Sequence, residues 1–371
     1  MKRLIIMAAG LLLVAVACQQ RAKEFEVDFT KEYDGVKVDL NDIAENLRIV
    51  RLDTAGGNYI EYFNGFVGKE YIIHIGRKKI ALYSKNGKFI RTIAAQGRGP
   101  GEYQFVDAWA VDKKEQTFLY HDFFSNEILR YNLSLKQKEK SIPFESKGQL
   151  NGMFFHNDST VAVCPRRFGG YKYQYFFIHL SGEIVRGEEK EGDVKKAKLG
   201  FERTLKQTRK HEVIYQPGES EVVYQIEEKG KRKLLSFILP AGRKKEDKDE
   251  YYKGELRFLG DKMMILGKTK VTQRDNVCYF DPEDYLMSID EQEINRVDAY
   301  VFSDLKLSLR KIDIHQNGVI VHSSPALTFK DNLRYTLKKK KLSEEQRAKL
   351  IKLNASISKE ENPILIVGDL K

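Results

Sequence analysis

A pattern of short β-type runs recurs with a spacing of 48 residues, and this spacing limits the fold more than any other feature. Residues 78–89 (KKIALYSKNGKF) align without a gap on residues 126–137 (NEILRYNLSLKQ), which places Ile80 on Ile128. Runs rich in Ile, Val, Tyr and Phe, separated by Asn-Gly, Asp or Gly, are typical of strands. A unit of about 48 residues with four short strands has the size of a propeller blade.

The length of the repeating region sets the number of blades. Residues 47–335 hold about six such units, although only the first two or three show the repeat well. In the faint third copy, Gly182 lies at about twice the spacing from Gly87. Helical periodicity is missing from the first two thirds of the chain. The sequence therefore predicts an all-β fold, a six-bladed β-propeller of four-stranded blades.

The C-terminal segment departs from this rhythm. In residues 342–358 (LSEEQRAKLIKLNASIS), Ser343 and Gln346 have the spacing of a capping box, and apolar residues follow at helical intervals. We expect a helix over 342–358 packed on the rim of the propeller. A closing strand over 362–370 should then pair with LRIVRLD (residues 47–53), because propellers commonly close their ring by joining the two ends of the chain.

The first residues have the composition of an export signal. Lys2 and Arg3 precede an apolar run, and Ala15-Val16-Ala17-Cys18 resembles the lipobox of bacterial lipoproteins. We expect residues 1–17 to be a lipoprotein signal peptide and Cys18 to carry the lipid. Residues 18–46 would be the tether and lead-in, and 47–371 the propeller. The alternative is an ordinary secretory signal with a chance cysteine.

Longer stretches resemble a known family. ALYSKNGKFIRTIAAQGRGPGEYQFVDAWAVD (residues 81–112) resembles the NHL-type propeller repeat and, more closely, a family of six-bladed β-propeller lipoproteins common in Bacteroidota. The segment Val223 to Ile226 and the final ENPILIVGDLK fit the same family. The resemblance implies a lipid-anchored protein of the bacterial cell envelope. Gln19 and Gln20, which are not acidic, favour the periplasmic side of the outer membrane over the surface.

The sharpest motif of this resemblance is GRGPGEY, residues 97–103. A phosphate-binding loop would need a following helix and a Lys-Ser/Thr pair, whereas here a strand follows. The segment is instead expected to cross from the outermost strand of one blade (KFIRTI) to the innermost strand of the next (DAWAVD). We assign a structural role in this crossing to Gly97, Gly99, Pro100 and Gly101. Glu102 and Tyr103 are left as candidate ligand contacts or anchors of the segment.

Aromatic residues supply the other candidate contacts. Tyr171, Tyr173 and Tyr175 alternate, so they are expected to share one face of a strand, where exposed rings could stack on sugars. Packing between blades is the favoured alternative. Trp109, flanked by two alanines, is predicted to belong to the core near the axis.

No pattern indicates a metal or a catalytic group. In the 48-residue register His74 falls on Asp122 rather than on His121, and neither HxH nor HExxH occurs. We expect no metal, cofactor or catalytic residue, with His74 and Asp122 as ordinary strand residues. Cys164 and Cys278 are expected to be thiols, although one disulfide would be compatible with an oxidising periplasm.

The charge of the chain narrows its partners. The formal net charge is +11, or +9 once Lys2 and Arg3 are removed with the signal. Because the chain is expected to be exported, nucleic acid is excluded, and the lysine runs are interpreted as a solvated rim. The sequence predicts a binding or scaffold protein for a protein or glycan partner, and the alternative is a lyase or hydrolase that uses the axial pocket.

Overall fold

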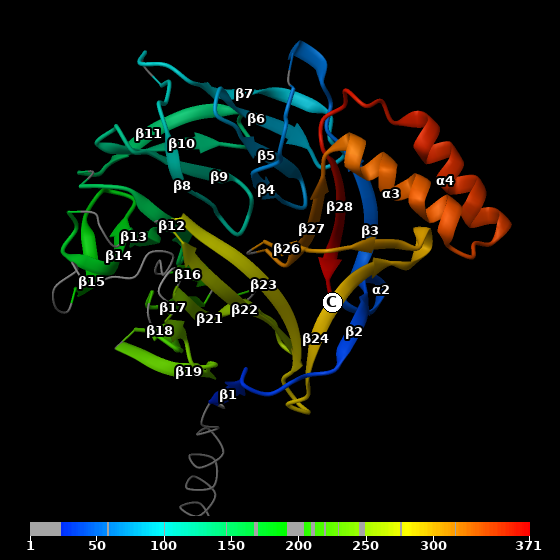
Figure 1. The fold of residues 1–371 in the computed structure, drawn as a ribbon. Helices are drawn as coiled ribbons and strands as arrows, with labels where there is room; N and C mark the ends of the chain where they lie inside the picture. The colour runs from blue at the N-terminus through cyan, green and yellow to red at the C-terminus, as the bar shows by residue number, and fades with distance from the viewer. Residues whose placement is uncertain are drawn as a thin grey trace, which may run out of the picture.

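The computed structural model describes residues 24–371 apart from 58, 100, 146, 167–169, 191–203, 209–211, 219, 229, 245–248, 275–276 and 316. Within these residues the strands form six sheets arranged as blades around an axis (Figure 1). The predicted six-bladed β-propeller is thereby confirmed. None of the described helices is long and apolar enough to cross a membrane.

The first three blades are regular four-stranded antiparallel sheets whose strands follow one another from the axis outward. Blade 1 contains β4 (Gly65–Val67), β5 (Tyr71–Ile75), β6 (Lys79–Ser84) and β7 (Phe89–Ala95). Blade 2 contains β8 (Val106–Val111), β9 (Thr117–Asp122), β10 (Glu127–Asn132) and β11 (Gln137–Pro143). Blade 3 contains β12 (Leu150–Phe155), β13 (Thr160–Pro165), β14 (Tyr173–His179) and β15 (Ile184–Glu189).

Blades 4 and 5 carry additional strands at their edges. Blade 4 contains β16 (Thr204–Gln207), β17 (Val213–Gln216), β18 (Val222–Glu227) and β19 (Gly230–Ile238), with β1 (Phe25–Asp28) parallel to β19. Blade 5 contains β21 (Asp249–Leu259), β22 (Met263–Arg274), β23 (Val277–Ser288) and β24 (Ile294–Phe302). Its additions are β20 (Arg243–Lys244), β2 (Gly35–Asp39), which is parallel to β24, and β25 (Leu307–Leu309). Within the expected lead-in segment, residues 18–46, the strands β1 and β2 thus cover the edges of blades 4 and 5.

Blade 6 closes the ring with both ends of the chain. It contains β26 (Asp313–Ile314), β27 (Val319–Ser324), β28 (Ile364–Leu370) and β3 (Ala44–Arg51). β28 is antiparallel to β3, with Leu365 opposite Val50. The expected pairing between the final strand and the LRIVRLD segment is therefore confirmed. Short helical pieces lie in the connections: α2 (Leu40–Ile43), η1 (Ala55–Gly57) and η3 (Ser303–Leu305).

Apolar side chains fill the space between neighbouring blades. Each adjacent pair of blades shares one buried cluster, and in the middle strands β9 and β13 every residue is buried. A strand packed on both faces tolerates consecutive apolar residues, which explains Phe118 to Tyr120 in β9 and Val161 to Cys164 in β13. Outermost strands such as β15 are mostly exposed and polar. The sequence of each strand thus reflects its distance from the axis.

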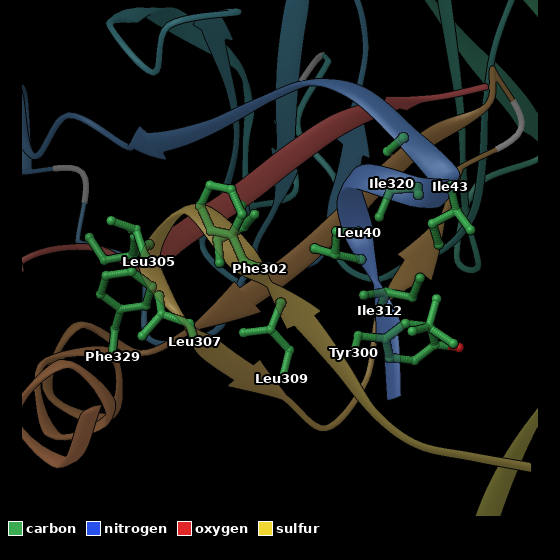
Figure 2. Close-up of a cluster of buried hydrophobic side chains, with 14 of the residues drawn as sticks. Leu40, Ile43, Tyr300, Phe302, Leu305, Leu307, Leu309, Ile312, Ile320 and Phe329 are labelled. Atoms are coloured by element: carbon green, nitrogen blue, oxygen red, sulfur yellow. The ribbon is translucent and has the colours of Figure 1, made fainter. Parts of the chain in front are cut away.

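Two helices lie beside blade 6, outside the ring (Figure 1). α4 (Glu344–Ser356) begins with the predicted capping box, since the hydroxyl of Ser343 accepts from the Gln346 N–H at 3.1 Å and the Gln346 side chain accepts in return. α3 (Ala326–Lys339) was not expected from the sequence. Phe329 of α3 and Leu350 of α4 are buried in the cluster between blades 5 and 6, part of which Figure 2 shows.

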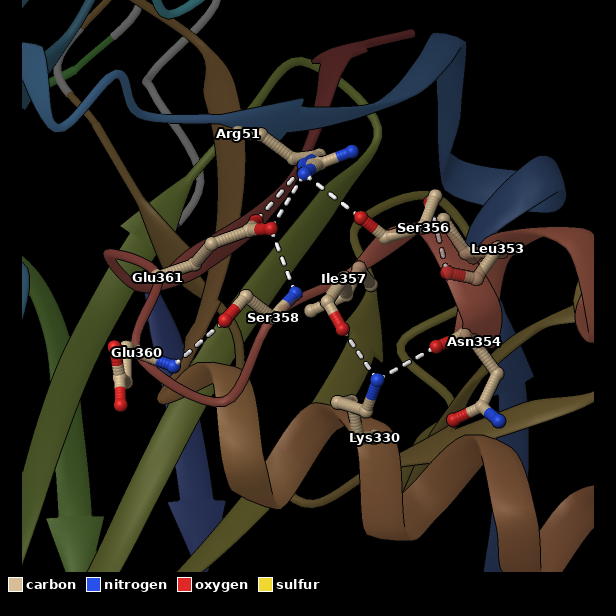
Figure 3. Close-up of polar contacts among 9 residues, drawn as sticks. All are labelled: Arg51, Lys330, Leu353, Asn354, Ser356, Ile357, Ser358, Glu360 and Glu361. Atoms are coloured by element: carbon tan, nitrogen blue, oxygen red, sulfur yellow. Dashed lines mark hydrogen bonds and ion pairs between the residues drawn. The ribbon is translucent and has the colours of Figure 1, made fainter.

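Polar contacts fasten the end of α4 to blade 6 (Figure 3). The Nε of Arg51 on β3 donates to a carboxylate oxygen of Glu361 at 2.9 Å, and its Nη2 donates to the carbonyl oxygen of Ser356 at 3.1 Å. The other carboxylate oxygen of Glu361 accepts from the N–H of Ser358 at 2.7 Å. One arginine therefore joins the closing strand pair to the helical segment.

Candidate functional site

Two adjoining cavities lie on the axis of the ring. Their volumes are about 370 and 320 Å³, and they share Phe154, Asp313, Ile314 and His315 in their walls. The innermost strand of every blade contributes, through β4, β8, β12, β16, β21 and β26. Within the part of the chain that the structure describes, all six blades line this axial cavity, so we take it as the candidate site.

The larger part of the axial cavity is charged. Lys206 Nζ lies 2.7 Å from a carboxylate oxygen of Glu255, and the Nε of Arg257 lies 3.9 Å from the other oxygen. Burial alone would raise the pKa of Glu255, but the charge and hydrogen bond of Lys206, with Lys253 and Arg257, lower it to about 2. Glu255 is therefore ionised throughout the neutral range.

Arg257 extends this network away from the axis. Its guanidinium contacts the carboxylate of buried Asp284, which also accepts from the hydroxyl of Tyr300 at 3.4 Å. Burial raises the pKa of Asp284, and the charge of Arg257 opposes this rise. The charged groups of the cavity thus pair with one another, which leaves a wall of satisfied ions rather than an isolated acid or base.

His315 stands between the two parts of the cavity. Its Nδ1 accepts a hydrogen bond from the main-chain N–H of Val67 at 3.2 Å, so the proton of the neutral ring resides on Nε2. Burial lowers the pKa of His315 to about 4. At neutral pH this ring is an uncharged donor.

The smaller part of the axial cavity is aromatic on one side. Phe66 contacts Trp109 edge to face, with ring centroids 6.3 Å apart, and lies 6.0 Å from the His315 ring. Trp109 was predicted to be core, yet it is only half-buried and lines the cavity. Its position on β8, the innermost strand of blade 2, brings it to the axis. Together the two parts offer ionic groups and apolar rings to one ligand.

Asp107 also lines the smaller part, but its carboxylate is engaged. One oxygen lies 2.6 Å from Nδ1 of the fully buried His121, and the other accepts from the N–H of Leu150 at 2.7 Å. Asp107 thereby connects blade 2 to the first residue of β12 in blade 3. We assign this pair to the joint between blades.

His74 and Asp122 remain in separate blades with separate partners. The Nδ1 of His74 accepts from the N–H of Asn64 at 3.5 Å, and burial lowers its pKa to about 4. Asp122 accepts from the main-chain N–H groups of Gln104 and Phe105 at 3.1 and 2.8 Å. Among the described residues, no group of three or more His, Cys, Asp or Glu side chains is placed to hold a metal ion.

The GRGPGEY segment crosses from β7 to β8 as expected. Glu102 accepts from the N–H of Gly99 at 2.7 Å, and the hydroxyl of buried Tyr103 donates to the carbonyl of Gly76 at 2.6 Å. Both side chains therefore anchor the segment, and Tyr103 is almost fully buried.

The glycines of this segment serve different needs. Gly101 has φ of +74°, whereas a Cβ at Gly97 would overlap the carboxylate of Glu102. Gly99 lies beside the same carboxylate, and a Cβ there would come within 3.0 Å of it. Pro100 lies outside the described residues.

The tyrosine row does not form one face, so that prediction is wrong. The register of β14 against β15 shifts between Tyr173 and Tyr175, which is the mark of a β-bulge. Tyr171 and Tyr173 consequently pack with the cluster between blades 2 and 3, whereas Tyr175 packs with the cluster between blades 3 and 4. Tyr171 and Tyr175 are buried, which agrees with the packing alternative.

The cysteines divide between the described and undescribed parts of the chain. Cys164 and Cys278 are thiols rather than a disulfide, and Cys164 is buried. Cys18 and the expected signal peptide, residues 1–17, lie outside the described residues.

Sequence reasoning missed most residues of the axial cavity. Lys206, Glu255, Arg257, Asp313 and His315 all lie on or beside the innermost strands of blades 4 to 6. The available signal was the alternation of polar residues two apart, as in Glu255 and Arg257 or Asp313 and His315, which directs both toward one side of a strand. The faint repeat in these blades concealed which strands are innermost.

Comparisons with known proteins agree with the fold. A family model described as a domain of unknown function (DUF4934) matches residues 24–369. None of the curated proteins matches the chain. A protein from Bacteroides fragilis, described as exported, has a similar structure with a TM-score of 0.62 at 14% identity, over 94% of this chain and 100% of that one. A DUF4221 member from Bacteroides vulgatus gives a TM-score of 0.43 at 10% identity, over 89% and 97%.

Proposed function

This chain belongs to the family described as a domain of unknown function (DUF4934), and from this premise we propose that it is an exported binding protein. A lipid on Cys18 holds it at a membrane, and its axial cavity takes the end of a glycan or peptide partner. The observation that carries the proposal is the convergence of all six innermost strands on one cavity with a charged part and an aromatic part.

The charge state of the cavity favours binding over catalysis. A general acid or base needs a pKa near the working pH, whereas the pKa of Glu255 is about 2 and that of His315 about 4. Both groups keep a fixed protonation state at neutral pH and are held by Lys206 and by the N–H of Val67. Fixed donors and charges of this kind suit the recognition of a polar ligand.

A cavity-filling substitution tests the site. Ile314 lines both parts of the axial cavity and is half-buried, so Ile314→Trp fills their shared space. Glycan and peptide arrays probed with the labelled protein should capture a ligand that this variant no longer binds. Ile351→Trp, at an exposed position on α4, is the matched control and should bind like the wild type. A folded Ile314→Trp protein that captures the same ligand equally well contradicts the proposal.

The same experiment addresses the enzyme alternative. A lyase or hydrolase in the axial cavity would convert the captured glycan or peptide, and the products would be visible by mass spectrometry. If the wild type converts the ligand and Ile314→Trp does not, the function of the axial cavity is catalysis rather than binding alone.

The proposed membrane attachment and cellular location are supported by other features. The segment Ala15-Val16-Ala17-Cys18 supports a lipid anchor, and the similarity to an exported Bacteroides protein supports the cell envelope, with the outer membrane facing the periplasm as the proposed place. We also propose that the blades are repeats of the NHL type, which the resemblance of residues 81–112 supports. Growth with a labelled fatty acid should label the wild type and Cys278→Ala but not Cys18→Ala. Labelled Cys18→Ala protein would exclude the anchor.

A further inference from the structure

A second pocket lies where the chain crosses from blade 1 to blade 2. Its volume is about 530 Å³, and its walls include Asn64, Arg77, Gln96, Gln104 and Phe105. None of its lining residues belongs to the axial cavity. Among the described residues of the GRGPGEY segment, Tyr103 lines this crossing pocket, and Gln96 and Gln104, which flank the segment, line it as well.

Buried hydrogen bonds hold the walls of the crossing pocket in place. The hydroxyl of Tyr103 ties the segment to Gly76, next to Arg77 on the turn between β5 and β6. The carboxylate of Asp122, itself buried, accepts from the N–H groups of Gln104 and Phe105. The backbone of these two wall residues is therefore fixed before a ligand binds, so binding costs little further ordering of the wall.

Exposed aromatic rings flank the crossing pocket. Phe105 is 47% exposed and Phe124 is 63% exposed, values unusual for phenylalanine. The two lie near each other, because the N–H of Phe123 donates to the carbonyl of Phe105 at 2.9 Å. Beside them are the amides of Asn64, Gln96 and Gln104. Those of Asn64 and Gln96 each donate one hydrogen bond to a main-chain carbonyl, at 3.3 and 3.4 Å, and an amide has a second donor and a carbonyl oxygen besides. Flat apolar rings next to amides match the two faces of a sugar, its C–H surface and its hydroxyl groups.

The charge around the crossing pocket is positive. Arg77, Lys78 and Arg98 are exposed, and within the described part of the chain none of them forms an ion pair. The nearby carboxylate of Glu102 is directed at the N–H of Gly99, and that of Asp122 at main-chain N–H groups. Arginine binds carboxylate and sulfate groups through two parallel hydrogen bonds. An acidic ligand is thereby favoured over a neutral one.

We propose that the crossing pocket binds an acidic saccharide, with Phe105 stacked on a sugar ring and Arg77 paired with its carboxylate or sulfate group. Phe124 extends the stacking surface, and Gln104 contacts hydroxyl groups. The crossing pocket is separate from the axial cavity, so this proposal does not depend on the ligand proposed for the axial cavity.

An array of immobilised glycans provides the test, with uronic acid, sialylated, sulfated and neutral saccharides and with acidic peptides as competitors. The full chain should retain acidic glycans in preference to neutral ones. Phe105→Ser and Arg77→Gln should each weaken this binding by about tenfold or more, the loss expected for one stacking or one charged contact. Arg77→Gln should also reduce the preference for acidic over neutral glycans.

Matched controls separate this site from other surfaces. Tyr335→Ser and Lys339→Gln alter an exposed ring and an exposed cation on α3 and should leave binding unchanged. Ile314→Trp, which fills the axial cavity, should also leave it unchanged. The proposal is overturned if the protein retains no acidic glycan, retains neutral glycans equally well, or prefers acidic peptides. It is also overturned if binding is unchanged in both Phe105→Ser and Arg77→Gln.

Discussion

The Nζ of Lys330 on α3 lies 2.7 Å from the main-chain carbonyl oxygen of Asn354 on α4, and it also donates to the carbonyl of Ile357 (Figure 3). The last carbonyl groups of a helix have no partner within it, and a positive charge is favourable there. The side chain of Lys330 is buried. One ammonium group therefore satisfies the end of α4 and joins both helices at the rim.

We expect Lys330→Met to destabilise the protein by about 2–3 kcal/mol, because methionine keeps the volume but leaves the carbonyl groups of Asn354 and Ile357 without this donor. Unfolding in urea, followed by far-ultraviolet circular dichroism, measures the change. Lys338→Met, on an exposed position of the same helix, should change stability by less than about 0.5 kcal/mol. Equal midpoints for both variants would show that the Lys330 contacts contribute nothing.

The ring closure makes a second prediction at Asn362. Its side-chain oxygen accepts from the N–H of Ile60 at 2.7 Å and its amide donates to the carbonyl of Asp53 at 3.1 Å, so it joins the segment before β28 to the connection after β3. Asn362→Ala should cost about 2–3 kcal/mol, since it leaves the buried N–H of Ile60 without an acceptor. Thermal unfolding compared with the exposed Asn332→Ala checks this. An unchanged melting temperature for Asn362→Ala would refute it.

The sequence predicted those parts of the fold whose strands carry local signals. Middle strands carry consecutive apolar residues, and the 48-residue register rests on β6 of blade 1 and β10 of blade 2, which hold equivalent places in their blades. α3 was not expected, although its buried residues Phe329 and Leu333 lie four apart, which is the spacing of one helix face. The edge strands β1 and β2 are short and pair in parallel with distant strands, which no local pattern encodes.

The candidate site was less predictable for a related reason. The bulge between Tyr173 and Tyr175 places Tyr175 on the other side of the blade from Tyr171 and Tyr173, and a period of two cannot reveal such a shift in advance. Glu255 and Lys206 meet only because blades 4 and 5 are neighbours in the ring. By contrast, the role of the GRGPGEY segment was predictable, because its glycines indicate a sharp turn between two recognisable strands.

The anchor of that segment gives a third prediction. Tyr103→Phe removes only the hydroxyl that donates to Gly76, so stability should fall by about 1–2 kcal/mol while the buried ring still packs. Tyr335→Phe, at an exposed position, should have no measurable effect. Denaturant titration monitors both variants. If Tyr103→Phe equals the wild type, the hydroxyl does not hold the crossing segment.

Stability should decrease with acid in two separate ranges. His74 and His315 have pKa values of about 4 in the folded protein, lowered by burial from 6.5, so the unfolded chain binds their protons more readily. Their stabilisation is complete above pH 6.5 and is lost as the pH falls toward 4, by at most about 3 kcal/mol for each ring. The pKa of Glu255, lowered from 4.5 to about 2, adds a loss only below pH 4.5.

Urea midpoints measured from pH 8 to pH 3 resolve these ranges. The wild type should lose stability steadily below pH 6.5, and His315→Asn should have a smaller slope between pH 6.5 and 4, because asparagine can accept from the Val67 N–H without titrating. The slope below pH 4.5 should remain, since Glu255 is unchanged in this variant. Parallel profiles for the two proteins above pH 4.5 would mean that His315 titrates alike in the folded and unfolded states, contrary to the effect of its burial.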